Sequence, residues 1–161
     1  MPLSNFERMI QMAEEVFAVK DDPNQLDISE AVIQRLQELH HNAMIEVDEG
    51  EGPIVWVILI PTTTALMNEF IGHKISEKEL FELTPLNATY DALYLCSAMV
   101  LEEYRRKGLV TKVVEEAYLE MKKQHPFKSL FVWSFTPEGN ASAEALARRF
   151  GLPLFKRKNN D

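Results

Sequence analysis

The stretch "SAMVLEEYRRKGLVTKVVEEAYLEMKK", residues 97–123, decides the fold of this chain. It starts as an apolar, strand-like run, passes through a basic turn that ends at Gly108, and continues as an amphipathic helix. The apolar residues of that helix recur every three or four positions and form one wide face: Leu109, Val110, Val113, Val114, Ala117, Tyr118 and Met121. We therefore expect a strand, a turn and a helix in direct succession.

The turn holds Arg105, Arg106 and Lys107 directly before Gly108. A helix N-terminus has unpaired N–H groups and a partial positive charge, and glycine lets the backbone approach an anion closely, so this turn suits phosphate. A P-loop would need a second glycine followed by Lys and Ser or Thr, which this segment lacks. A solvated basic turn that balances neighbouring glutamates is the alternative.

The composition is that of a soluble globular protein, and 161 residues suit one domain, 1–161. A formal net charge of −8 argues against broad binding to nucleic acid or to anionic membranes. The single cysteine permits neither an internal disulfide nor a thiolate zinc cluster, and the scattered histidines predict no metal site. With no signal-like or membrane-spanning run, we expect a cytoplasmic protein.

Periodicity and capping signals predict an α/β order of elements in which helices cover a partly parallel, mixed sheet. Capping boxes start three helices, Ser4 with Glu7, Asp27 with Glu30 and Ser76 with Glu79. Two apolar runs around "EGEG" predict a hairpin. The predicted helices are 5–18, 27–40, 63–72, 76–84, 108–124 and 140–150; the predicted strands are 42–48, 53–60, 92–100, 129–135 and 153–157.

The segment "AMVLEEYRRKGLVTKVV", residues 98–114, resembles the acetyl-CoA-binding motif of the Gcn5-related N-acetyltransferase (GNAT) superfamily. In that motif a strand ending in V-x-P-x-Y-R is followed by [RQ]-x-x-G-x-[GA] and a helix. Val100, Tyr104, Arg105 and Gly108 fall in register with it. The resemblance implies that the basic turn seats the pyrophosphate of coenzyme A.

A second segment, "LFVWSFTPEGNASAEALARRFGL", is similar to the superfamily's second motif, a strand followed by N-x-x-A-x-x-L-Y and G-F. Asn140, Ala143, Leu146 and Gly151 match in spacing, and the two motifs together cover residues 93–152. The resemblance implies a GNAT-like acyl-CoA N-acyltransferase fold, a mixed central sheet flanked by helices. The family's first and last strands have no counterpart among the predicted elements.

The resemblance also implies how acetyl-CoA, the expected co-substrate, is held. Backbone groups of Ala98 and Val100 would bind the pantetheine arm, amides from Arg105 to Val110 would cradle the pyrophosphate, and Asn140 would contact coenzyme A as its arm leaves. The implied cofactor-binding residues are Ala98, Val100, Arg105, Arg106, Lys107, Gly108, Leu109, Val110 and Asn140.

Catalytic candidates come from the strand before the turn. Alternation along a strand places Tyr94, Cys96 and Ala98 on one face, and family members often carry their base where Tyr94 and Cys96 stand. Neither residue is the Glu or His that such a base usually is. The structural alternatives are that Tyr94 is a core aromatic residue and that Cys96 is a small buried one. The same choice between a catalytic and a structural role applies to Ser134 on the next strand.

These features predict a CoA-dependent N-acyltransferase that moves acetyl from acetyl-CoA to a primary amine of a small molecule or protein by direct transfer. The alternative is a degenerate GNAT-fold protein that binds acyl-CoA or a protein partner without turnover, because Ala147 stands where the family often has a tyrosine that protonates the thiolate. Residues 91–157 would bind the cofactor and 4–90 would shape the acceptor side. A homodimer is one way to cover an exposed sheet edge.

Overall fold

The computed structural model describes residues 3–20, 30–133 and 137–158. Its helices are α1 (Asn5–Lys20), α2 (Glu30–Leu39), α3 (Thr64–Ile71), α4 (Glu77–Leu83), α5 (Leu109–Met121) and α6 (Pro137–Phe150), with a 3₁₀ turn, η1, at Glu102–Tyr104. Its strands are β1 (Met44–Asp48), β2 (Pro53–Thr62), β3 (Ala92–Val100), β4 (Ser129–Trp133) and β5 (Leu154–Arg157).

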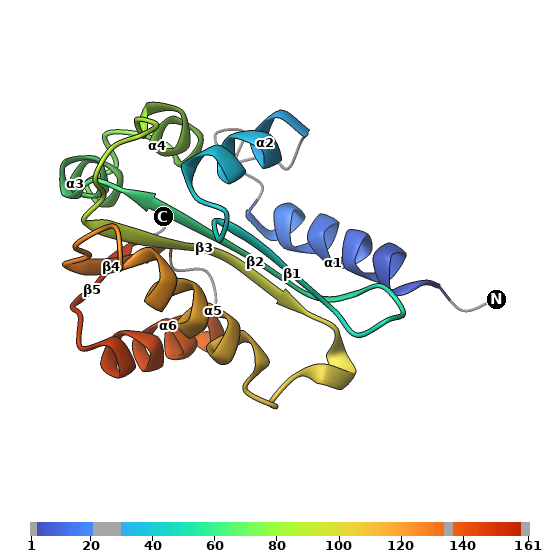
Figure 1. The fold of residues 1–161 in the computed structure, drawn as a ribbon. Helices are drawn as coiled ribbons and strands as arrows, with labels where there is room; N and C mark the ends of the chain where they lie inside the picture. Colours follow the sequence, from blue (N-terminus) through green and yellow to red (C-terminus); the bar gives the residue numbers. More distant parts are fainter. Residues whose placement is uncertain (1–2, 21–29, 134–136, 159–161) are drawn as a thin grey trace.

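The strands form one mixed sheet in the order β1-β2-β3-β4-β5. The pairs β1–β2 and β2–β3 are antiparallel, whereas β3–β4 and β4–β5 are parallel. Helices α1 and α2 lie on one side of the sheet, and α5 and α6 lie on the other (Figure 1). The predicted mixed sheet flanked by helices is therefore confirmed.

The predicted elements appear in the predicted order, and β3 has the predicted bounds. Both capping boxes within the described residues form: Ser76 with Glu79 at α4, and Ser4 with Glu7 at α1. Helix α6 begins three residues before the predicted start at 140, and α5 ends three residues before the predicted end at 124. Residues 27–29, together with Ser134 and residue 135, lie outside the described residues.

The core lies against β2 and β3. Nine of the ten residues of β2 are buried, as its unbroken apolar run predicts for a strand covered on both faces. Helices contribute one apolar face each, including Met9, Leu36, Phe70 and Val114. Within the described ranges, no helix is long and apolar enough to cross a membrane.

Strands β3 and β4 separate after a short contact, and this separation creates the site. Parallel pairing covers only Ala92 to Tyr94 of β3, which then continues to Val100 paired with β2 but not with β4. A bulge marks the separation: the β2 register passes from Ile58↔Ser97 to Leu59↔Leu95, which leaves Cys96 as the extra residue. The strict alternation predicted for β3 is therefore wrong beyond this point, because a bulge re-aims the side chains that follow it.

Candidate functional site

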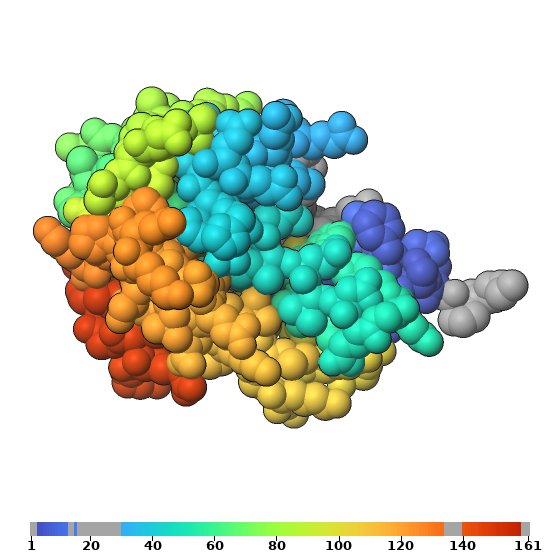
Figure 2. All heavy atoms as spheres, in the orientation of Figure 1, coloured from blue at the N-terminus to red at the C-terminus, as the bar shows by residue number. Residues whose placement is uncertain are grey.

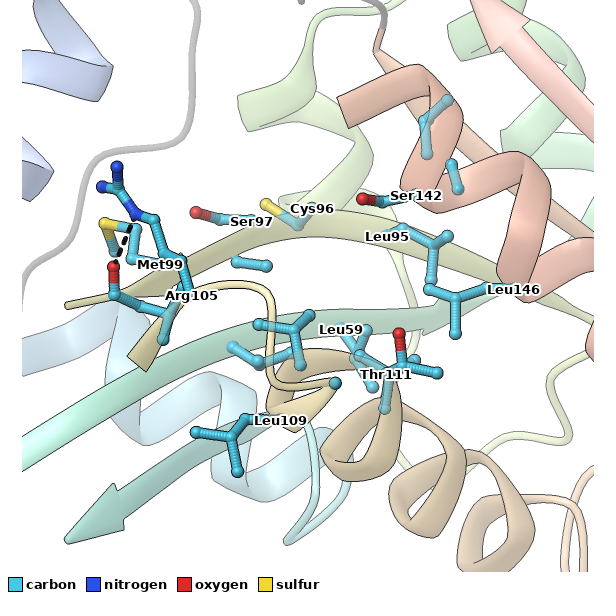
Figure 3. Close-up of a pocket in the computed structure, with 18 of the residues that line it drawn as sticks. Leu59, Leu95, Cys96, Ser97, Met99, Arg105, Leu109, Thr111, Ser142 and Leu146 are labelled. Atoms are coloured by element: carbon cyan, nitrogen blue, oxygen red, sulfur yellow. Dashed lines mark hydrogen bonds between the residues drawn. The ribbon is translucent and has the colours of Figure 1, made fainter. Parts of the chain in front are cut away.

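A cavity of about 880 Å³ extends along the unpaired part of β3 and is walled by residues of α5 and α6. Figure 3 shows Cys96 and Ser97 on β3, Thr111 on α5, and Ser142 on α6 around it. Met12 of α1, on the opposite side of the sheet, also lines it, and its sulfur lies 3.9 Å from Arg105 Nη2. The predicted site residues that line it are Cys96, Ala98, Val100, Arg105, Arg106, Gly108, Leu109, Val110 and Asn140.

The turn after β3 adopts an unusual backbone conformation. Gly108 has φ 72° and ψ 14°, and Arg106 has φ 63°, a left-handed conformation that costs a non-glycine residue about 1 kcal/mol or more. Such strain recurs at functional sites, where alternating backbone conformations turn successive N–H groups into an anion-binding concavity. In Figure 2 this segment (yellow) lies at the surface beside the β1–β2 hairpin.

The amides of this turn point to an anion site. In the part of the chain that the structure describes, the N–H groups from Arg106 to Thr111 donate to no backbone carbonyl. The next amide, that of Lys112, donates to the Gly108 carbonyl over 3.0 Å. We call the N–H groups of Arg106–Thr111 the amide corner. The Arg105 amide donates instead to the Glu102 carbonyl over 3.2 Å, so it lies outside the corner.

Gly108 leaves space at this corner. A Cβ built on it would meet no protein atom within 4 Å. Because Gly108 lines the cavity, this space is open to a ligand. The predicted reason for the glycine, close approach of an anion to the backbone, fits both its conformation and its surroundings.

The basic side chains lie around the corner rather than in its centre. The Arg105 Nε donates to the Val100 carbonyl over 3.2 Å (Figure 3). The Lys107 ammonium lies over the Tyr104 ring, 5.5 Å from its centroid, and does not line the cavity. Arg106 is exposed and lines the cavity, so among the three it is placed best to meet a phosphate.

The unpaired edge of β3 offers further backbone groups. The Leu101 amide donates to the Ile54 carbonyl on β2 over 3.0 Å. Alternate residues of a strand direct their N–H and C=O to opposite sides. Ala98 and Val100 therefore direct theirs away from β2 and into the opening.

Tyr94 and Cys96 occupy different places at the far end of the cavity. Cys96 lines the cavity, whereas Tyr94 is fully buried behind the wall. The Tyr94 hydroxyl donates to Glu77 Oε2 over 2.5 Å, and the Cys96 thiol donates to the same oxygen over 3.9 Å. Burial, and then the charge of Glu77, raise the pKa of Tyr94 well above its usual value, so its hydroxyl stays protonated.

Arg157 completes this region. It is only 8% exposed, and its guanidinium lies over the rings of Phe70 and Trp133, 4.4 and 5.0 Å from their centroids. Its Nη1 donates to the Ile75 carbonyl over 2.7 Å, two residues before Glu77. We call Glu77, Tyr94, Cys96 and Arg157 the acyl end. Sequence reasoning missed Glu77 and Arg157, because Glu77 reads as an ordinary acidic residue in the first turn of a capped helix.

Comparisons with known proteins agree with the geometry. A search of curated proteins found no match. Among solved structures, the crystal structure of Chaetomium thermophilum Naa20 in complex with a bisubstrate analogue is similar, with 12% identity and a TM-score of 0.50. The alignment covers 79% of this chain and 60% of that chain, so this chain spans less than two thirds of that protein's length.

The model of the acetyltransferase (GNAT) family matches residues 64–152, a little over half of the chain. The matched region contains β3, the amide corner, α5, β4 and α6. On these grounds the chain belongs to the acetyltransferase (GNAT) family.

Proposed function

We propose that this chain is a CoA-dependent N-acyltransferase that transfers acetyl from acetyl-CoA to a primary amine by direct transfer. One observation carries the proposal: the amide corner opens into a cavity that continues along the unpaired edge of β3. The corner provides N–H donors and a helix N-terminus for a diphosphate. The strand edge provides backbone partners for an amide-containing arm.

The dimensions fit an extended ligand. Cys96 and Val100 are four residues apart on β3, and a strand rises about 3.3 Å per residue, so this stretch of strand edge spans roughly 13 Å. A thioester would then lie near Cys96, with the Ala98 and Val100 amides directed into the same opening. Such preorganised donors stabilise the oxyanion that forms during acyl transfer.

The acceptor is a primary amine of a small molecule or a protein. Naa20 was crystallised with a bisubstrate analogue, a ligand that joins two substrates in one site. That supports a ternary complex, in which the amine attacks the thioester directly. Met12 of α1 lines the cavity, so we place the approach of the amine on the side of α1, opposite α5.

Catalytically silent binding of acyl-CoA is the second candidate, and Ala147 favours it. This residue is buried in α6, away from the cavity lining, so it offers no acid to the departing thiolate. The two candidates differ only in turnover, because both need the amide corner.

Calorimetric titration with acetyl-CoA and with S-acetylpantetheine, which lacks the diphosphate, tests the site. We expect acetyl-CoA to bind at least tenfold more tightly, because charge-assisted hydrogen bonds contribute about 1.5 to 3 kcal/mol each. Thiol release over a panel of amines and amino-terminal peptides then tests turnover. Equal affinity for the two ligands would refute the proposed site, and tight binding without thiol release would favour the silent alternative.

A further inference from the structure

The acyl end contains a carboxylate that the cofactor site does not need. Glu77 is the first residue of α4, follows the N-cap Ser76, and is only 1% exposed. The helix N-terminus favours its negative charge. Its Oε2 accepts hydrogen bonds from the hydroxyl of Tyr94 and the thiol of Cys96.

Burial of this charge is expensive unless the site has a use for it. A buried ion is costly to desolvate, and well-packed apolar residues of similar volume often serve stability equally well. The groups that face Glu77 include Tyr94 and Cys96 on β3, and Arg157 of β5 is bonded to the loop before α4. The arrangement resembles a base that is oriented by a second group.

Of the Tyr94 hydroxyl and the Cys96 thiol, only the thiol reaches the cavity. Cys96 lines it, at the bulge where β3 leaves β4, whereas Tyr94 is sealed behind the wall. A thiol has an ordinary pKa of about 8.5, close enough to neutrality to pass a proton. Tyr94, whose pKa is raised, keeps its proton and holds the carboxylate in place.

We propose that Glu77 accepts, through the Cys96 thiol, the proton that the acceptor amine must lose before it attacks acetyl-CoA. This inference rests on the proposed function. The ammonium N–H bond breaks as its proton moves to the Cys96 sulfur, and the thiol's own proton moves to Glu77 Oε2. The freed nitrogen lone pair forms a bond to the thioester carbon, the C–S bond breaks, and the departing thiolate takes a second proton from that nitrogen. Glu77 afterwards returns its proton to solvent.

The decisive variant is Glu77→Gln, with Glu79→Gln as the matched control. Glu79 lies on the same helix, is exposed, and its replacement by Gln keeps a capping side chain. The reaction is thiol release from acetyl-CoA with the best amine of the panel, or with water when no amine reacts. We expect Glu77→Gln to lower kcat about 10²- to 10⁴-fold, the usual range for loss of a general base, with unchanged affinity for acetyl-CoA. Glu79→Gln should match the wild type.

The pH profile separates a proton acceptor from a structural residue. The wild-type rate should show an acid limb, as general-base catalysis requires, and the residual rate of Glu77→Gln should lack that limb. A purely structural role would lower the rate at every pH and leave the limb in place. An equal rate in Glu77→Gln and wild type, or an unchanged limb, would overturn the inference.

Substitutions of Cys96 keep the test valid if Glu77→Gln fails to fold, because this side chain is small and only half-buried. Cys96→Ser should retain part of the rate, since a hydroxyl also passes a proton. Cys96→Ala should lose as much as Glu77→Gln, and the double variant should lose no more, because residues that act as a unit are not additive. An active Cys96→Ala variant would overturn the inference.

Alkylation by iodoacetamide locates the thiol independently, because Cys96 is the only cysteine. Bound acetyl-CoA should slow its alkylation at least tenfold; unchanged alkylation in a saturated complex would count against this placement. Failure of acetyl-CoA to bind would instead refute the proposed function. Binding with no turnover to any amine or to water would overturn the proton route and leave the coenzyme site intact.

Discussion

The amide corner and the acyl end lie in one cavity but are built in different ways. The corner is main chain from one short segment, Arg106–Thr111. The acyl end is side chains from three elements, α4, β3 and β5, that span residues 77 to 157 of the sequence. A site made of backbone is specified by local conformation, whereas a site made of side chains depends on how distant elements pack.

The two regions also differ in their exposure to water. Arg105, Arg106 and Lys107 at the corner are largely exposed, where single charges contribute little to stability. At the acyl end, Glu77 and Arg157 are buried among aromatic rings, where packing errors and unpaired charges are costly. Variants should therefore affect stability most at the acyl end and affinity most at the corner.

The largest effect on stability is expected from Phe70→Ala. Phe70 is fully buried and contacts the rings of Tyr94, Phe131 and Trp133 as well as the Arg157 guanidinium. Loss of this side chain should cost about 3 to 5 kcal/mol in the free energy of unfolding, measured by urea denaturation.

Phe6→Ala is the matched control for that variant. Phe6 makes one edge-to-face contact with Trp56 and is 55% exposed, so its loss should cost under about 1.5 kcal/mol. Equal costs for the two variants would mean that the acyl end is not the tightly packed region described above.

Gly108→Ala should reduce affinity for acetyl-CoA at least tenfold. The added methyl group would stand in the open space at the corner, where the anion approaches. Gly151→Ala is the control, because Gly151 has φ 70°, has no neighbour near an added Cβ, and lies away from the cavity lining. Both variants should lose about 1 to 2 kcal/mol of stability from left-handed strain. An equal loss of affinity in both would remove Gly108 from the site.

The corner could be predicted from the sequence because its signals are local. The apolar run of 92–100, the basic turn and the period of α5 all act within one segment, and β3 has the predicted bounds. Capping boxes also depend on residues three apart, and both that fall within the described residues form. Gly108 adopts the left-handed conformation that a glycine in such a turn permits.

The acyl end could not be predicted, for the opposite reason. Glu77 and Cys96 meet only because α4 packs against β3, and no local pattern encodes that contact. The bulge at Cys96 breaks the alternation that a strand pattern assumes. Regular alternation predicts Tyr94 and Cys96 on the same face of the strand, yet of the two only Cys96 lines the cavity. The roles of both in catalysis stay predictions.

The pH profile assigned to Glu77 needs a stability baseline, and two buried histidines supply one. Burial lowers the pKa of His40, helped by His41 and His125, and burial also lowers the pKa of His125. As pH falls below about 6.5, the unfolded chain takes up protons that the folded chain resists, so unfolding becomes easier. Urea denaturation between pH 5 and 8 should show this decline, and His40→Gln should flatten it. A decline of the same size in His40→Gln would assign it to other groups.

The smallest effect is expected from the exposed ion pair that joins α1 to η1. Arg8 donates to both carboxylate oxygens of Glu103, over 2.7 and 2.5 Å, and these bonds lower the pKa of Glu103 from 4.5 to about 2. Its contribution to stability is therefore complete above pH 4.5 and is lost as pH falls from 4.5 through 2. In Arg8→Gln, NMR titration should show that the pKa of the Glu103 carboxyl returns to about 4.5. Affinity for acetyl-CoA should change little, because the ion pair involves none of the corner amides. If the pKa of Glu103 is already near 4.5 in the wild type, this contact does not hold α1 to η1.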